Sequence, residues 1–397
     1  MKVLFLTHRL PYAPNRGDRI RAYHLLQEMS GWADVSLFSL VHDQDEEAQA
    51  AKVPFAKTVV TARVPRVSNY LRGALRLASS WPLTHSLLDA PDARAKLTAM
   101  IAAEPPDVVL AYCSGMARFA LEPPLAGLPL VLDMVDVDSE KWERMARQAP
   151  WPRHWVYARE ARTLAAFERV ASARSRTVLV VSAHERDVLT ALVPNVTIQL
   201  VPNGVDIEAF RPTCAPSDEP IVAFTGMMDY EPNVKAVTWF AREVWPRVVA
   251  SWPDARFMIV GARPTRAVRA LAERDTSITV TGRVDAVQPW LWRSAVAVAP
   301  LLTARGLQNK VMESLAAGLP VVVTSVVRAG LPAGVERGCL VADGPEAWTK
   351  AVVNLLALSA DDRRRMALTS HVHALGWSAQ LAELAGVLSA ARRVGPF

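Results

Sequence analysis

The stretch RGLQNKVMESLAAGLPVVVT, residues 305–324, decides the fold of the second half of the chain. It predicts a loop, a short helix, a turn and a buried strand. Asn309 can cap the helix start, because its side-chain oxygen can accept from the first free backbone N–H groups. Gly318 can end the helix in the left-handed conformation, and Pro320 cannot continue it. Residues 321–323 are all valine and predict a strand that is apolar on both faces, as a covered parallel sheet requires.

The predicted helix carries two charged residues that suit a ligand. Lys310 and Glu313 are three positions apart, so they share one helix face near its positive end. A lysine beside free helix N–H groups suits a phosphate, and a carboxylate one turn later suits sugar hydroxyls. A nucleotide sugar offers both groups. The alternative is a surface Lys–Glu pair on an ordinary helix.

The rest of the chain alternates strands with helices. Residues 2–7 read as a strand, residues 20–29 as a helix, and a second alternation begins at Ile221. This pattern predicts parallel sheets with helices on both faces, and 397 residues suit two such α/β domains. We expect a first domain at residues 1–205, a second at 206–376, and a final helix from Trp377 to about Arg392.

Composition narrows the class of partner. The net charge is +6, which fits phosphorylated substrates or anionic lipid, and no DNA- or RNA-binding motif accompanies it. Cys113, Cys214 and Cys339 lie far apart, so neither a zinc site nor a disulfide framework is indicated, and a reducing cytoplasm is the expected location. The apolar run at residues 3–6 is too short for a signal peptide, and no apolar window reaches about 18 residues.

The opening stretch resembles a pattern found in glycosyltransferases of family 4. These enzymes carry E-x7-E followed by A-x-G-x-P-V-V, and Glu313 with the residues from Ala316 to Val322 matches the second Glu and the run. The sequence VPNGVD, residues 201–206, matches a second signature. The resemblance implies the GT-B fold, which has two facing Rossmann-like domains and a last helix that crosses back to the first. It also implies retaining, metal-independent transfer of a sugar from a nucleotide-diphosphate donor, with no cofactor.

The resemblance implies roles for several residues. Glu313 would hold ribose hydroxyls and Lys310 the phosphate, and a glycine-containing loop near the start would approach the donor. The family places an Arg after the first strand of the second domain, where this chain has Met227, and Lys235 matches the following Lys only loosely. The donor-binding candidates are Gly17, Gly226, Gly282, Arg283, Val284, Arg305, Gly306, Asn309, Lys310 and Glu313.

Arg305 departs from the family pattern, which has its first Glu at this position. The planar guanidinium matches phosphate or carboxylate. We therefore expect Arg305 either to contact the diphosphate or to accompany a donor sugar with an acidic group.

Asp136 is the candidate catalytic residue of the first domain, beside Lys310 and Glu313 in the second. Asp136-Val137-Asp138 looks like the D-x-D that binds manganese in the GT-A fold, but it falls on the expected acceptor side. In family 4 the residue after this strand lies beside the reacting carbon, and Asp136 is near that position. Its carboxylate would orient the acceptor hydroxyl or support the cationic sugar. Alternatively, Asp136 caps the next helix.

Within family 4 the chain is most similar to the sugar transferases of the exosortase (PEP-CTERM) system. GDRIR at residues 17–21 and QNKVMES at residues 308–314 are among the segments that carry this similarity. It implies exopolysaccharide assembly on a glycan or lipid-linked acceptor. Two rival functions stay open: a sugar-nucleotide epimerase of GT-B fold, and a non-catalytic homologue that binds glycan or nucleotide, which Met227 and Arg305 favour.

Residues 63–81 suggest a membrane contact. Tyr70, Leu71, Ala74, Leu75 and Ala78 follow helical spacing and form an apolar stripe, while Arg72 and Arg76 share another face. A basic amphipathic helix of this kind can lie on an anionic bilayer, so peripheral attachment to the inner face of the cytoplasmic membrane is a candidate. The alternative is a helix whose apolar face packs on the sheet of the first domain.

Overall fold

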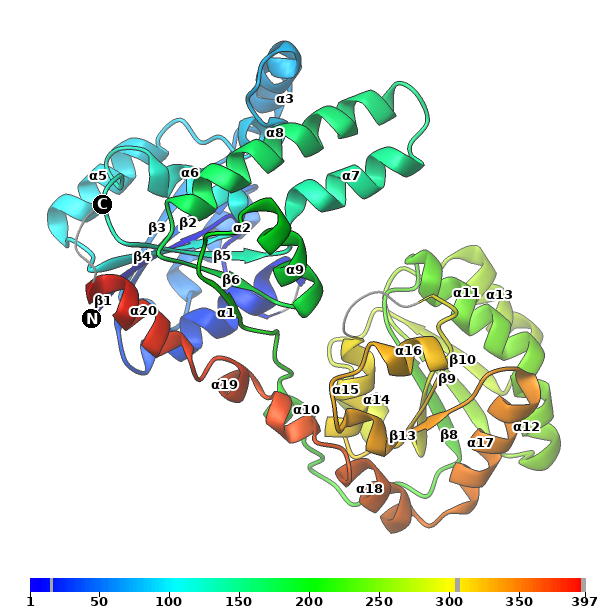
Figure 1. Cartoon of the computed structure of the whole chain (residues 1–397). Helices are drawn as coiled ribbons and strands as arrows, with labels where there is room; N and C mark the ends of the chain where they lie inside the picture. Colours follow the sequence, from blue (N-terminus) through cyan, green and yellow to red (C-terminus); the bar gives the residue numbers. More distant parts are fainter. Residues whose placement is uncertain (15–16, 304–307, 394–397) are drawn as a thin grey trace. The chain divides into compact units, whose positions relative to one another are not determined.

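The computed structural model describes residues 1–14, 17–303 and 308–393, and the chain divides into two compact units. Unit 1 contains Met1–Asn203 and Gln380–Phe397, and unit 2 contains Gly204–Ala379. The chain therefore passes between the units twice, once in each direction. Figure 1 shows a sheet with surrounding helices in each unit.

Unit 1 is built on a seven-stranded sheet in the order β3-β2-β1-β4-β5-β6-β7, and the strand pairs recorded for the described residues are parallel. Its strands are β1 (Lys2–Thr7), β2 (Asp34–Val41), β3 (Thr58–Arg63), β4 (Val108–Tyr112), β5 (Leu130–Val135), β6 (Thr177–Val180) and β7 (Ile198–Leu200). Its helices are α1 (Gly17–Ser30), α2 (Gln44–Ala48), η1 (Ala50–Lys52), α3 (Arg66–Leu75), η2 (Arg76–Ala78), α4 (Leu83–Leu87), α5 (Ala93–Ala103), α6 (Ser114–Leu121), α7 (Asp138–Gln148), α8 (Arg153–Ala173), α9 (Ala183–Leu192) and α20 (Leu384–Arg393).

Unit 2 is built on a six-stranded parallel sheet in the order β10-β9-β8-β11-β12-β13. Its strands are β8 (Ile221–Thr225), β9 (Arg256–Val260), β10 (Ile278–Gly282), β11 (Val296–Ala299), β12 (Val321–Val323) and β13 (Cys339–Val341). Its helices are α10 (Ile207–Phe210), α11 (Glu231–Trp239), η3 (Phe240–Val244), α12 (Trp245–Ser251), α13 (Arg266–Arg274), α14 (Gln288–Trp292), α15 (Asn309–Ala316), α16 (Ser325–Ala329), η4 (Val335–Gly338), α17 (Pro345–Ala357), α18 (Ala360–Leu368) and η5 (Val372–Leu375), with α19 (Trp377–Gln380) at the passage back to unit 1.

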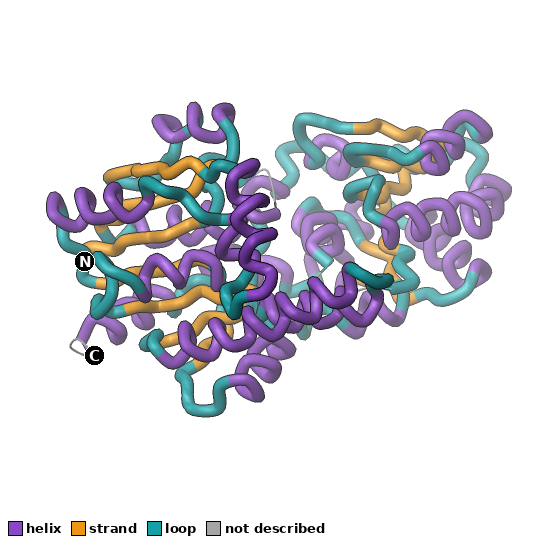
Figure 2. Tube along the Cα trace, turned by 90° about the horizontal axis from the view of Figure 1, so that it is seen from above, coloured by secondary structure: helices purple, strands orange, loops and turns teal. Residues whose placement is uncertain are grey.

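Helices cover both faces of each sheet, which explains why the central strands are apolar throughout (Figure 2). Every residue of β4, β8 and β12 is buried. Alternation of polar and apolar residues would place polar groups under a helix, where they would lack water. The expectation of two parallel α/β sheets is confirmed.

The helix of the opening stretch ends as its sequence predicts. Gly318 adopts a left-handed φ of 78°, and its N–H donates to Leu315 O while the Leu319 N–H donates to Ser314 O. These two bonds form a Schellman motif, which satisfies carbonyl groups at the helix end. The start differs by one residue: Asn309 is the first helical residue, and Gln308 occupies the cap position without a side-chain cap bond among the described atoms.

Three elements differ from the expectation. The final helix is interrupted, because α19 ends at Gln380 and α20 begins at Leu384. No bounds were predicted for a helix in the segment DSEKWERMARQ, which forms α7 and packs beside α8 as an antiparallel pair. The short edge strand β7 has no residue that is fully buried, so it carries no strong apolar signal.

Helix α20 lies against the sheet of unit 1 although it follows the whole of unit 2 in the sequence (Figure 1). Leu384 and Leu388 are fully buried there, and Arg392 Nε lies 3.4 Å from Asp107 Oδ1. The C-terminal segment is therefore part of the core of unit 1.

The arginines of the GDRIR segment pair with buried acids inside unit 1. Arg19 Nη2 lies 2.9 Å from Glu46 Oε1. Arg21 donates to both carboxylate oxygens of Asp133 in β5, at 2.8 and 3.1 Å, and also to Asn203 Oδ1 at 3.0 Å. Arg21 and Asp133 are 2% and 0% exposed, so this pair ties α1 to the middle of the sheet and to the end of the unit.

We expect Arg21→Met to destabilise unit 1 by about 3–5 kcal/mol, because it leaves the Asp133 carboxylate buried without its cation. Urea denaturation measures the change. The double variant Arg21→Met/Asp133→Leu should recover most of the loss, because it removes both charges. The control Arg94→Met breaks an exposed pair with Glu122 and should cost less than about 1 kcal/mol. An equal loss in the two single variants would contradict this account.

Candidate functional site

The strand order of unit 2 reverses at one point of the sheet, between β8 and β11. From β8 the chain continues outward through β9 and β10, and from β11 it continues in the other direction through β12 and β13. The loops that leave the carboxyl ends of β8 and β11 therefore diverge, and ligands of open α/β sheets bind at such a point. Gly226 follows β8, and the segment after β11 leads into α15.

Lys310, in the first turn of α15, reaches across this point toward β8. Its Nζ donates to Asn233 Oδ1 at 2.6 Å and lies 4.2 Å from the centre of the Phe224 ring. Asn233 is buried in the first turn of α11, and its own amide donates to Met227 O at 2.9 Å, which fixes the orientation of the side chain. The ammonium group is thus positioned by an amide oxygen and a ring face.

Lys310 and Glu313 are both half-buried, and burial shifts both acid–base equilibria. Burial lowers the pKa of Lys310 to about 7, and the nearby Glu313 carboxylate partly opposes that shift. Burial raises the pKa of Glu313 to about 7, against the opposing effect of Lys310. Both groups are therefore poised to change charge near neutral pH, which is typical of functional sites.

Glycines allow the backbone to approach closely beside Lys310. Gly226 has a φ of 152°, and a Cβ on it would lie 2.7 Å from Asn233 Nδ2 and 3.2 Å from Lys310 Nζ. Gly261, which follows β9, has a φ of 155°, and a Cβ there would lie 1.7 Å from Gly226 O. A side chain at either position would displace the loop that holds Lys310, so the site requires glycine twice.

The remaining donor-binding candidates of the described chain lie around this edge with different surroundings. Gly282 ends β10 with a φ of 70° and open space beside it, and Arg283 is exposed. Val284 packs against a small cluster that includes Met258. Asn309 is exposed at the start of α15.

The other predicted residues lie outside the described residues, in unit 1, or on the exposed side of α11. Arg305 and Gly306 lie outside the described residues. Gly17 begins α1 in unit 1, so it belongs to a different unit from Lys310. Lys235 pairs with Glu231 on the exposed side of α11 at 2.7 Å, away from the Lys310 contacts.

Two polar groups near the site were not predicted from the sequence. One is Asn233, whose signal is its place in the first turn of the helix after β8. The other is Arg263, which follows β9 with a φ of 56° and whose Nε lies 3.0 Å from Asp229 Oδ2. Arg263 supplies a cation in the loop beside Met227, the position where the family pattern has Arg.

Asp136 lies exposed in unit 1, directly after β5. The alternative that it caps α7 is wrong, because the cap position is Val137 and no side-chain cap bond is recorded there for the described residues. Two buried carboxylates accept from this helix start instead: Glu185 from the Val137 N–H at 2.6 Å, and Glu168 from the Ser139 N–H at 3.1 Å. Burial raises the pKa of Glu185, and it raises the pKa of Glu168 to about 7.

Asp138 is not arranged as a partner of Asp136 in a metal site. Its carboxylate accepts from Ser114 Oγ at 2.8 Å, and burial raises its pKa. Among the described residues, Glu140, His184 and Glu185 bring their ligand atoms within 4.8 Å of one another. This set differs from the D-x-D pair that the sequence suggests.

The strand order of unit 1 also reverses at one point of the sheet, between β1 and β4. His8 follows β1, stacks on Tyr112 with ring centres 5.6 Å apart, and places Nδ1 3.5 Å from Cys113 Sγ. Burial raises the pKa of Cys113 to about 12, so its thiol is not prepared as a nucleophile. Covalent catalysis by a Cys–His pair is therefore not supported here.

The two halves of the chain match two family models. Residues 16–204 match the glycosyl transferase 4-like domain, and residues 219–358 match the glycosyl transferases group 1. A comparison with curated proteins finds no match.

Solved structures share the fold over the whole chain. Sucrose-phosphate synthase from Thermosynechococcus elongatus is 18% identical, with 98% of each chain covered and a TM-score of 0.68. Anabaena HepE in complex with UDP and glucose is 14% identical, with 98% of this chain and 100% of that chain covered and a TM-score of 0.58. The α,α-trehalose-phosphate synthase (UDP-forming) from Burkholderia vietnamiensis gives the same coverage, identity and TM-score. The family matches divide between two Rossmann-like units of parallel sheet, and the chain belongs to the family 4 glycosyltransferases of GT-B fold.

Proposed function

We propose that this protein transfers a sugar from a nucleotide-diphosphate donor to a glycan, with retention of configuration and without a metal ion. The observation that carries the proposal is the half-buried Lys310 ammonium at the sheet reversal of unit 2, with Glu313 one turn later on the same helix. A cation for phosphate and a carboxylate for hydroxyls are the two groups that a nucleotide sugar requires. Structures of similar fold were solved with UDP and with UDP-glucose, which supports this class of donor.

In the proposed reaction, the bond between the anomeric carbon and a diphosphate oxygen breaks, and the acceptor hydroxyl oxygen forms the new bond. The acceptor proton passes to the departing diphosphate. Negative charge grows on the leaving group as the bond breaks, so a fixed cation is worth more in the transition state than in the ground state. Lys310 supplies that cation, and the free N–H groups at the start of α15 add a partial positive charge. Glu313 accepts from the ribose hydroxyls.

Asp136 takes the acceptor side of the proposal. It is an exposed carboxylate at the carboxyl end of β5, and the carboxylates around it are occupied by the start of α7. A free carboxylate at a strand end can orient an acceptor hydroxyl or support positive charge on the sugar. Arg305 remains assigned to the donor, as a contact to the diphosphate or to an acidic sugar.

We assign the reaction to exopolysaccharide assembly on a lipid-linked acceptor at the cytoplasmic side of the membrane. Support comes from the similarity of the GDRIR and QNKVMES segments to the exosortase-associated transferases. The rival functions predict different outcomes with the donor, because an epimerase forms a new sugar nucleotide and a non-catalytic binding homologue forms no product. A thermal-shift screen with UDP, GDP, ADP and their sugars identifies the base, because a ligand of the folded state raises its stability.

NMR of the chosen donor then separates the three functions. An α-configured glycoside formed from an α-configured donor, only when an acceptor is present, supports retaining transfer. A new sugar nucleotide without any acceptor would establish the epimerase. Tight binding with no product from any acceptor would establish the binding homologue.

We expect Lys310→Ala to lower kcat by about 10²–10³, as the loss of a donor to a developing anion does. Glu313→Ala should mainly weaken donor binding, because it removes contacts made before the chemical step. Lys235→Ala and Glu231→Ala are matched controls, since this exposed pair lies on the outer side of α11. Steady-state kinetics and calorimetry measure the effects. Wild-type kinetics in either site variant would show that the donor binds elsewhere.

Donor affinity should have a maximum near pH 7. The pKa values of Lys310 and Glu313 are both about 7 in the free protein. A bound diphosphate favours charged Lys310, so binding takes up a proton above pH 7 and affinity falls by as much as about tenfold per pH unit. Ribose hydroxyls favour ionised Glu313, so affinity also falls below pH 7, where this carboxyl is protonated.

Calorimetry with the donor sugar nucleotide tests this pH dependence, because its diphosphate does not titrate in this range. Glu313→Gln should remove the acidic decline and leave the alkaline decline in place. A flat profile from pH 5.5 to 9 in the wild-type protein would contradict the proposed roles of both residues.

Turnover should survive excess EDTA, because Lys310 and the start of α15 meet the charge that a divalent ion would neutralise. The rate of donor consumption with and without EDTA measures this. Loss of activity that manganese restores would overturn metal independence. Variants Glu140→Gln and His184→Gln would then test the group at α7 and α9 as ligands, with Asp138→Asn as the D-x-D comparison.

A further inference from the structure

Helix α3 exposes its apolar stripe to solvent. Tyr70, Leu71, Ala74, Leu75 and Ala78 are all exposed, and Leu75 is 84% exposed. Val67, one turn before Tyr70 and Leu71, is 79% exposed and extends the stripe. The alternative that this face packs on the sheet of unit 1 is therefore wrong. A contiguous exposed apolar surface of this kind marks an interaction site.

The opposite face of α3 is attached to unit 1 by polar contacts. Asn69 is fully buried, and its side-chain amide donates to Asp89 O at 2.8 Å and Leu87 O at 3.2 Å. Gly73, one turn later, is also buried. The polar and small residues of the helix thus face inward, and its large apolar residues face outward, the reverse of an ordinary surface helix.

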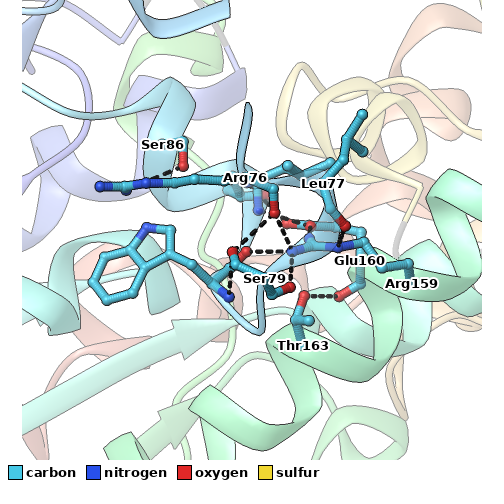
Figure 3. A network of polar contacts seen from close by, with 10 residues as sticks. Arg76, Leu77, Ser79, Ser86, Arg159, Glu160 and Thr163 are labelled. Carbon is cyan, nitrogen blue, oxygen red and sulfur yellow. Dashed lines mark hydrogen bonds and ion pairs between the residues drawn. The ribbon is translucent and has the colours of Figure 1, made fainter. Parts of the chain in front are cut away.

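A buried arginine of α8 fixes the end of this helix. Arg159 donates to the carbonyl oxygens of Leu77, Arg76 and Trp81 at 3.0, 3.0 and 2.7 Å (Figure 3). The neighbouring Glu160 accepts from the backbone N–H groups of Leu83 and Thr84, both at 2.8 Å. Buried polar bonds from Arg159 and Glu160 therefore fix the segment that follows α3, and with it the orientation of the helix. The exposure of the apolar stripe is a consequence of these bonds.

A second group of exposed aromatic residues lies at the N-terminal end of α8. Trp155 precedes Arg159 by one helical turn and is 51% exposed, and Trp151, in the turn between α7 and α8, is 85% exposed. Arg159 of α8 bonds the segment that directly follows α3, and the α7–α8 turn immediately precedes this part of α8. Tryptophan and tyrosine are the residues that favour the boundary between lipid and water.

The positive charge of the segment around α3 favours an anionic partner. Residues 64–88 contain three arginines and neither Asp nor Glu. Arg66 and Arg72 are exposed on α3, where their aliphatic stems can lie along the apolar stripe while the guanidinium groups reach outward. The ion-pair distance from Arg72 to Asp89 is 3.6 Å, in an exposed setting where such a pair is weak. Arg153 adds an exposed cation between Trp151 and Trp155.

We propose that α3 and the α7–α8 turn together form a docking surface for an anionic lipid bilayer. Val67, Tyr70, Leu71 and Leu75 enter the boundary between headgroups and acyl chains, and Trp151 and Trp155 enter beside them. Arg66, Arg72 and Arg153 bind the lipid phosphates. None of the helices in the described ranges is long and apolar enough to cross a membrane. The surface does not depend on the donor site, because it is built within unit 1 alone.

Flotation with vesicles of phosphatidylglycerol and phosphatidylcholine, at low salt, tests the proposal. The wild-type chain should float with anionic vesicles and bind pure phosphatidylcholine much more weakly. Arg66→Glu/Arg72→Glu should lower the vesicle affinity by about thirtyfold or more, since each basic residue near an anionic surface contributes about fivefold. Leu71→Ser/Leu75→Ser should lower it by about a hundredfold, because two leucines no longer leave water.

Matched controls keep the result specific to this surface. Arg266→Glu/Arg274→Glu makes the same charge change on the exposed side of α13 in unit 2, and Leu358→Ser/Leu368→Ser makes the same apolar change at exposed sites around α18. Both control variants should bind vesicles nearly as the wild type does. A thermal-shift response to nucleotide shows that each variant is folded.

Three outcomes would overturn the proposal. The first is absence of wild-type binding to anionic vesicles at low salt. The second is equal loss in the control variants. The third is equal binding to neutral vesicles, which would remove the arginines from the mechanism. A concentration-dependent dimer that Leu71→Ser/Leu75→Ser abolishes, without vesicle binding, would assign the surface to a second copy of the chain.

Discussion

The site of unit 2 depends on the partial removal of one ammonium group from water. Charged groups leave water at a cost, which a protein offsets with oriented dipoles or lets appear as a pKa shift. Lys310 shows both effects. Its Nζ has an amide oxygen at 2.6 Å and a ring face at 4.2 Å, and burial still lowers its pKa to about 7. The group is held in place and remains short of compensating negative charge, which is the condition that favours an anionic ligand.

This condition explains the arrangement of the elements around it. The lysine comes from the helix that follows β11, while the amide and the ring come from the helix and strand on the β8 side. Only the reversal of strand order brings these two segments together. Gly226 leaves the volume into which the ammonium extends, because a Cβ on it would lie 3.2 Å from Nζ, and Gly261 leaves room for the Gly226 carbonyl group. Sheet topology, glycine placement and lysine electrostatics are therefore parts of one constraint.

The sequence predicts those features whose cause is local. The valine run of β12 is buried on both faces because helices cover the sheet, and Gly318 ends α15 because glycine adopts a left-handed φ readily. The placement of Lys310 and Glu313 on one helix face also follows from their spacing. Asn233 was not predicted, because its role depends on a residue 77 positions later in the chain. The helix at residues 138–148 was missed for a similar reason: its first N–H groups are satisfied by Glu168 and Glu185, which belong to other helices.

The sequence pattern of α3 predicts its two stripes but does not predict which of them faces the interior of unit 1. Helical spacing identifies an apolar stripe and a polar stripe, but the pattern alone is equally consistent with either stripe facing inward. The side-chain amide of the buried Asn69 donates to Leu87 O and Asp89 O. In the segment after the helix, α8 supplies a donor for carbonyl oxygens through Arg159 and an acceptor for N–H groups through Glu160. Because buried polar groups are costly when unpaired, the bonds made by Asn69, Arg159 and Glu160 oppose any rotation of the helix that would break them. These bonds make the outward position of four large apolar side chains a stable property of unit 1, and the exposed stripe becomes a surface prepared for an apolar partner.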